Sequence, residues 1–107
     1  FVFLIMQPFI EQYKNAIEIL CETHKVKSLY VFGSAAYGNM HEQSDVDFVV
    51  SFDDQLDPLE HGTQFLSLKA ELEKLFQREV DLLSDRAIRN PVLRAEIDAH
   101  KSLLYAA

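Results

Sequence analysis

The sequence predicts a small α/β (α+β) domain, a mixed β-sheet covered by helices, in the order αβ(α)βαβαβ. Three observations lead to this fold class. Apolar residues recur at helical spacing in long segments, short runs rich in β-branched and aromatic residues lie between them, and Gly, Pro and Asn mark the boundaries. A chain of 107 residues can bury one core. We expect a single domain over residues 6–107, with residues 1–5 as an extension without function.

The helices are predicted from periodicity and from their end signals. Apolar residues repeat every three to four positions over residues 8–24 and 59–77, with polar residues between them. The pair Asn90-Pro91 is a strong helix start, because Asn caps free backbone amides and Pro suits the first turn. This third helix should run to residue 100. The small polar residues over 34–39 suit a tight turn and a short helix.

Four segments have the composition of strands. Residues 26–32 are rich in β-formers and stop at Gly33. Residues 46–52 are almost wholly apolar in their middle, which predicts a strand buried on both faces. Shorter runs over 79–83 and 102–105 complete the expected sheet. Strands alternating with helices are typical of an α/β domain.

Charge and composition exclude several classes of protein. The formal net charge is −7 and the pI is about 4.9, which disfavours a nucleic-acid binder and suits a basic protein partner. A nucleotide can still bind if a divalent cation supplies positive charge locally. The single Cys21 leaves no disulfide framework, and a reducing cytoplasm is expected. The apolar start over residues 1–6 is too short to span a membrane.

Two carboxylates open the second predicted strand. Residues i and i+2 of a strand share a face, so Asp45 and Asp47 should point the same way while Val46 faces the core. Adjacent carboxylates repel unless a cation lies between them, and Mg²⁺ prefers oxygen ligands. Asp81 joins this acidic face if its strand pairs with the second. Three carboxylates could then hold two Mg²⁺ ions, or Mn²⁺ in their place.

Gly33-Ser34 follows the first predicted strand and offers the other half of a site. Glycine lets the backbone turn sharply, and the amides that follow can donate to an anion such as a triphosphate. The Ser34 hydroxyl adds a donor.

This combination resembles the signature of the DNA polymerase β-like nucleotidyltransferases. Gly33-Ser34, ten residues, then Asp45 and Asp47, with Asp81 on a later strand, match that signature in turn. The resemblance covers most of the chain after Met6, and the length is similar to that of the minimal nucleotidyltransferases, many of which are antitoxins to HEPN-domain toxins.

The resemblance implies Asp45, Asp47 and Asp81 as catalytic metal ligands, and Gly33, Ser34 and Tyr37 as the nucleotide-binding segment. It further implies transfer of AMP from ATP, with Mg²⁺, to a hydroxyl, the acceptor being a tyrosine of a cognate HEPN toxin. Relatives often carry Arg where this chain has Tyr37.

Other interpretations stay open at this point. The same fold could neutralise a partner by occlusion without catalysis, or modify a small molecule; homo- and hetero-oligomers are both compatible with the sequence. Asp45 and Asp47 could be a solvated strand entrance, and Glu79 or Asp85 could replace Asp81. Tyr37 could stack on the nucleotide or pack internally. A P-loop is rejected, because Asn39-Met40 stands where Lys-Ser/Thr is required.

Overall fold

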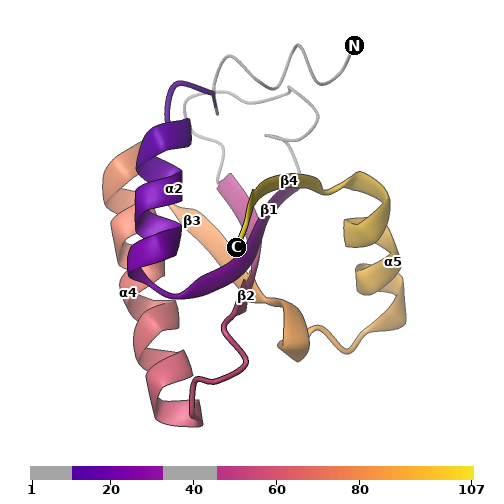
Figure 1. The fold of residues 1–107 in the computed structure, drawn as a ribbon. Helices are drawn as coiled ribbons and strands as arrows, with labels where there is room; N and C mark the ends of the chain where they lie inside the picture. The colour runs from indigo at the N-terminus through magenta and orange to yellow at the C-terminus, as the bar shows by residue number, and fades with distance from the viewer. Residues whose placement is uncertain (1–10, 33–45) are drawn as a thin grey trace.

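The computed structural model describes residues 11–32 and 46–107. In chain order its elements are α2 (Lys14–Thr23), β1 (Val26–Phe32), β2 (Val46–Phe52), α4 (Pro58–Phe76), β3 (Val80–Ser84), the 3-10 turn η1 (Asp85–Ala87), α5 (Pro91–His100) and β4 (Ser102–Ala106). The strands form one sheet in the order β3-β2-β1-β4 (Figure 1). β1 is antiparallel to β2 and β4, and β2 is parallel to β3. The sheet is therefore mixed, as predicted.

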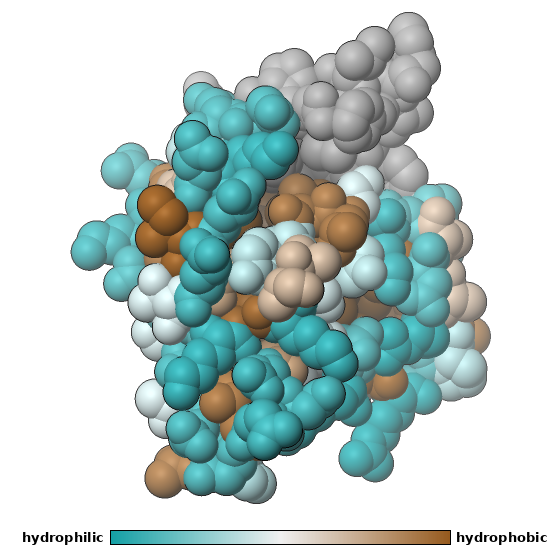
Figure 2. Space-filling model, in the orientation of Figure 1, coloured by the Kyte–Doolittle hydropathy of each residue, from teal (hydrophilic) through white to brown (hydrophobic). Residues whose placement is uncertain are grey.

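Helices cover both faces of this sheet. α2 and α4 lie together on one face, and α5 stands on the other (Figure 1). The main core fills the space between the sheet and the α2–α4 pair, whereas the surface seen in the same orientation is mostly hydrophilic (Figure 2). The most deeply buried side chains of the core are Ile17, Cys21, Leu29, Val31, Val46, Phe48, Val50, Leu68 and Leu72.

The second strand is buried on both faces, as its apolar sequence predicts. Phe48 and Val50 belong to the main core. Val49 and Ile97 of α5 are buried as well but lie outside that cluster. Alternation along the strand therefore sends Phe48 and Val50 toward α2 and α4, and Val49 toward the opposite face.

Side-chain caps fix where the two later helices begin. Asp57 accepts from the Glu60 amide at 2.8 Å, and the Glu60 carboxylate accepts from the Asp57 amide at 3.5 Å, which forms a capping box before α4. Asn90 Oδ1 accepts from the amides of Val92 and Leu93 at the start of α5. The predicted start at Asn90-Pro91 is confirmed.

The observed boundaries differ from the predicted ones by small shifts. α4 begins and ends one residue earlier than predicted, and β3 lies one residue later. The first helix was predicted to run unbroken over residues 8–24, but residues 12–13 form a turn and α2 spans only Lys14–Thr23. The predicted start at residue 8 and the short helix over 34–39 lie outside the described residues. The sequence did not predict η1, a single turn that prolongs β3.

A buried histidine joins the two helices on the core face. His24 Nδ1 donates to the Leu20 carbonyl oxygen at 2.8 Å, and Nε2 lies 2.9 Å from the Ser67 hydroxyl of α4. Both ring nitrogens thus have partners, which offsets the cost of burying them. Within residues 11–32 and 46–107, none of the helices has the length and apolar character to cross a bilayer.

The buried thiol of α2 gives a test of this packing. Desolvation first, and then the carboxylates of Glu18 and Glu22, raise the pKa of Cys21 to about 12. The thiolate is the reactive form, so native Cys21 should react with Ellman's reagent at pH 8 far more slowly than the denaturant-unfolded chain. Absorbance at 412 nm follows both reactions. A fast, stoichiometric reaction in native buffer would contradict the buried position.

Candidate active site

The parallel pairing of β2 with β3 sets two carboxylates side by side. In the register of the two strands Asp47 is the partner of Asp81. Neighbouring strands lie about 4.8 Å apart, so the two side chains start within reach of one shared ion. The pairing of β3 with β2 is the condition under which Asp81 was predicted to join the acidic face, and the metal-binding roles of Asp47 and Asp81 stay predictions.

Strand alternation turns both carboxylates away from the main core. The residues that flank them on their own strands, Val46 and Phe48, and Val80 and Leu82, are all buried in the core cluster. Asp47 is half-buried and Asp81 is exposed. Both therefore lie on the face of the sheet where α5 stands (Figure 1).

The crossover through α4 is what makes this pairing parallel. Two parallel neighbours cannot be joined by a hairpin and need a long connection, which α4 supplies between β2 and β3. Leu68, Leu72 and Phe76 of α4 are buried against the sheet. Burial of the α4 face thus holds β3 beside β2, and with it Asp81 beside Asp47.

The remaining predicted site residues adjoin this pair in the chain. β1 ends at Phe32, the register partner of Asp47, and Gly33 follows it directly. Asp45 directly precedes the start of β2. Gly33, Ser34, Tyr37 and Asp45 themselves lie outside the described residues, so their roles stay predictions.

The donor set suits a hard cation. Asp47 and Asp81 offer oxygen ligands from adjacent strands, which is the chemistry that Mg²⁺ or Mn²⁺ prefers. Within the described ranges, no group of three His, Cys, Asp or Glu side chains is placed to hold a metal. A third carboxylate would have to come from elsewhere, and the sequence offers Asp45 for it.

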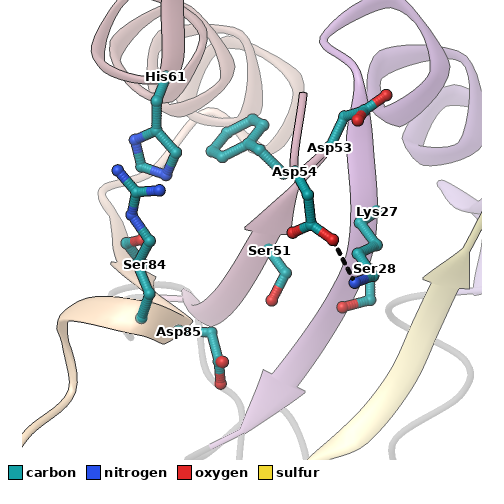
Figure 3. Close-up of a pocket in the computed structure, with 10 residues that line it drawn as sticks. Lys27, Ser28, Ser51, Asp53, Asp54, His61, Ser84 and Asp85 are labelled. Atoms are coloured by element: carbon teal, nitrogen blue, oxygen red, sulfur yellow. Dashed lines mark hydrogen bonds and ion pairs between the residues drawn. The ribbon is translucent and has the colours of Figure 1, made fainter. Parts of the chain in front are cut away.

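A pocket that the sequence did not predict lies at the other end of the same strands (Figure 3). It encloses about 220 Å³. Its walls come from the start of β1, the ends of β2 and β3, and the first turns of α4. The lining residues are Lys27, Ser28, Ser51, Phe52, Asp53, Asp54, His61, Ser84, Asp85 and Arg86.

Two aspartates that line this pocket are held in ion pairs. Lys27 Nζ lies 3.1 Å from Asp54 Oδ2, the contact drawn in Figure 3. Arg94 of α5 donates to Asp85 Oδ1 and to the Asp85 carbonyl oxygen, both at 2.7 Å. These contacts tie β1 to the loop after β2, and α5 to the end of β3.

His61 is the histidine that lines this pocket. The His61 ring packs edge-on against Phe52, with 5.0 Å between centroids. Desolvation, followed by the positive charge of Arg86, lowers the pKa of His61.

The sequence held one indication of this pocket. Residues 51–54 and 84–86 lie at the ends of two strands, and the carboxyl ends of parallel strands often border a cavity. That signal needed the parallel pairing to be known.

Residues 14–107 match the family described as polymerase beta, nucleotidyltransferase. Two proteins of Methanocaldococcus jannaschii, both named as candidate protein adenylyltransferases, are each 38% identical to this chain over 88 residues. Each match covers 82% of this chain and 84% of the relative.

Two solved structures superpose on this chain. A toxin–antitoxin crystal structure with AMP-PNP superposes with a TM-score of 0.69 at 27% identity, covering 88% of this chain and 73% of that one. A structure described as a candidate minimal nucleotidyltransferase superposes with a TM-score of 0.65 at 31% identity, covering 87% and 90% of the two chains. The predicted fold is thereby confirmed.

The acidic pair predicts an unusual effect of a neutral substitution. Without metal, Asp81→Asn removes repulsion with Asp47, so the melting temperature in EDTA should rise by roughly 1–3 °C. Asp85→Asn, four residues further on, breaks the contact with Arg94 and should lower it. Differential scanning calorimetry compares the two variants with wild type. A fall for both variants would mean that Asp81 is not repelled in the apo protein.

Proposed function

Because this chain belongs to the polymerase β nucleotidyltransferase family, we propose that it transfers AMP from ATP to a hydroxyl group, with release of pyrophosphate. The register partnership of Asp47 with Asp81 is the observation that carries the proposal. Two carboxylates on adjacent strands, both turned from the core, are costly to keep together and suit a site that binds metal. The coarser activity, nucleotidyl transfer, is that of the family.

Five of the predicted residues have a role in such a reaction. Asp45 and Asp47 would hold Mg²⁺ bound to the triphosphate, and Asp81 would join them on the side of the attacking hydroxyl. Bound Mg²⁺ supplies positive charge to the phosphates. Gly33 and Ser34 would donate to phosphate oxygens from the turn after β1. Asp81, exposed at the edge strand β3, can also accept the proton of the hydroxyl.

The acceptor we propose is a tyrosine of a cognate HEPN-domain toxin, which places this chain among the antitoxins. The toxin–antitoxin neighbour was crystallised with an ATP analogue, AMP-PNP, and the curated relatives are named as candidate protein adenylyltransferases. A net charge of −7 suits a basic protein partner. Neutralisation of the toxin would then be chemical rather than steric.

Nucleotide binding should depend on a divalent cation. Asp47 and Asp81 repel a triphosphate until metal bridges them. Isothermal titration calorimetry should show ATP binding with Mg²⁺ and little heat in EDTA. Asp47→Asn should weaken the metal-dependent binding, whereas Asp54→Asn, at the far end of β2, should leave it unchanged. Equal affinity with and without Mg²⁺ would exclude the metal-bridged site.

A transfer assay distinguishes covalent modification of the toxin from neutralisation by occlusion. Incubation with Mg-ATP and the purified cognate toxin should add the mass of AMP to the toxin, read by intact-protein mass spectrometry. The Asp45→Asn/Asp47→Asn double variant should add none and should fail to protect cells. If that variant still protects cells fully, occlusion without catalysis is the correct function.

A further inference from the structure

Lys101 lies between α5 and β4 and extends over the face of the sheet that carries Asp47. Its Nζ is 4.4 Å from the centroid of the Tyr30 ring, a cation–π distance. The same atom is 3.0 Å from Asp98 Oδ1, three residues back on α5. About 25% of the Lys101 side chain is exposed. Its ammonium group thus has two partners, while part of the Lys101 side chain stays open to solvent.

The strand register aligns Lys101 with the acidic pair. Ser102 of β4 is the partner of Val31, so the preceding residue, Lys101, is level with Phe32. Phe32 is the partner of Asp47, and Asp47 that of Asp81. Lys101 therefore begins about 10 Å from Asp47 across β1, as two strand spacings require.

The ammonium group is also on the same face as the carboxylates. Val31 and Phe48 point into the core with α2 and α4, and Tyr30 and Asp47 alternate with them along β1 and β2. Because Lys101 Nζ lies against the Tyr30 ring, it is on the Asp47 side of the sheet. The Lys101 ammonium group and the carboxylates of Asp47 and Asp81 thus lie on one face of the sheet. They lie on opposite sides of β1, the strand that leads into Gly33.

We propose that Lys101 binds the triphosphate of the nucleotide, a role that rests on the proposed function. A triphosphate held by metal at Asp47 and Asp81 extends several ångströms from the metal and carries more charge than the metal neutralises. A lysine on the opposite side of β1 is placed to meet its far end. In a chain of net charge −7, a local positive charge is needed for the far end of the triphosphate to bind favourably.

The contacts that Lys101 makes in this structure are weak enough to be exchanged for a phosphate. Asp98 is 47% exposed, and exposed ion pairs contribute little. A phosphate oxygen offers a stronger acceptor for the ammonium group than a solvated carboxylate. The Tyr30 ring can remain in contact with the aliphatic part of Lys101 while Nζ moves from Asp98 to phosphate. Asp98 is then a competitor that binds Lys101 when the site is empty.

A matched pair of variants tests the role of Lys101. Lys101→Gln and Lys27→Gln each change the net charge by one, from −7 to −8, and each breaks one ion pair with an aspartate. Lys27 lies at the opposite end of β1. In calorimetry with Mg-ATP, Lys101→Gln should weaken binding about tenfold, the usual loss for a hydrogen bond to a charged group, and Lys27→Gln should not. Lys101→Arg should keep most of the affinity.

Asp98→Asn provides an independent measurement, should Lys101→Gln lower the thermal stability. It removes the competitor and should tighten ATP binding in the wild-type background, but not when Lys101 is already Gln. Equal affinities for Lys101→Gln and Lys27→Gln, or no change with Asp98→Asn, would overturn the role of Lys101. Absence of ATP binding by the wild-type chain would instead remove the proposed function itself.

Discussion

The candidate site depends on one constraint, the parallel pairing of β2 with β3. Antiparallel neighbours can be joined by a hairpin, but parallel neighbours need a crossover, and α4 fills that role. The apolar face of α4 packs into the main core and so keeps β3 against β2. A register shift of one residue would turn Asp81 toward the core and Val80 toward solvent. Burial of Val80 and Leu82 therefore fixes the place of Asp81 as well as the stability of the sheet.

Local patterns predicted most of the fold. The capping residue Asn90, the alternation around Asp81 and the fully apolar centre of β2 each report on neighbours within a few residues, and each prediction is confirmed. The helical periodicity likewise located α4 to within one residue. The 3-10 turn after β3 was missed, because a single turn leaves too few residues to show a period.

What the sequence left open is non-local. It could say that Asp81 joins Asp47 if the strands pair, but the pairing itself depends on packing between distant segments. The position of Lys101 has the same origin, since β4 returns from the end of the chain to pair with β1. The far pocket also forms only when the ends of β2 and β3 meet. None of these juxtapositions has a signature in a short stretch of sequence.

The two ends of the sheet differ in how their negative charges are balanced. At the end with Ser51 and Ser84, Asp54 is paired with Lys27 and Asp85 is paired with Arg94. At the end with Asp47 and Asp81, two carboxylates share one register position. An acidic nucleotide can approach an acidic protein there only if cations separate the negative groups. Under the proposed function, metal between the carboxylates would supply one part of that separation, and Lys101, across β1, is placed to supply the other.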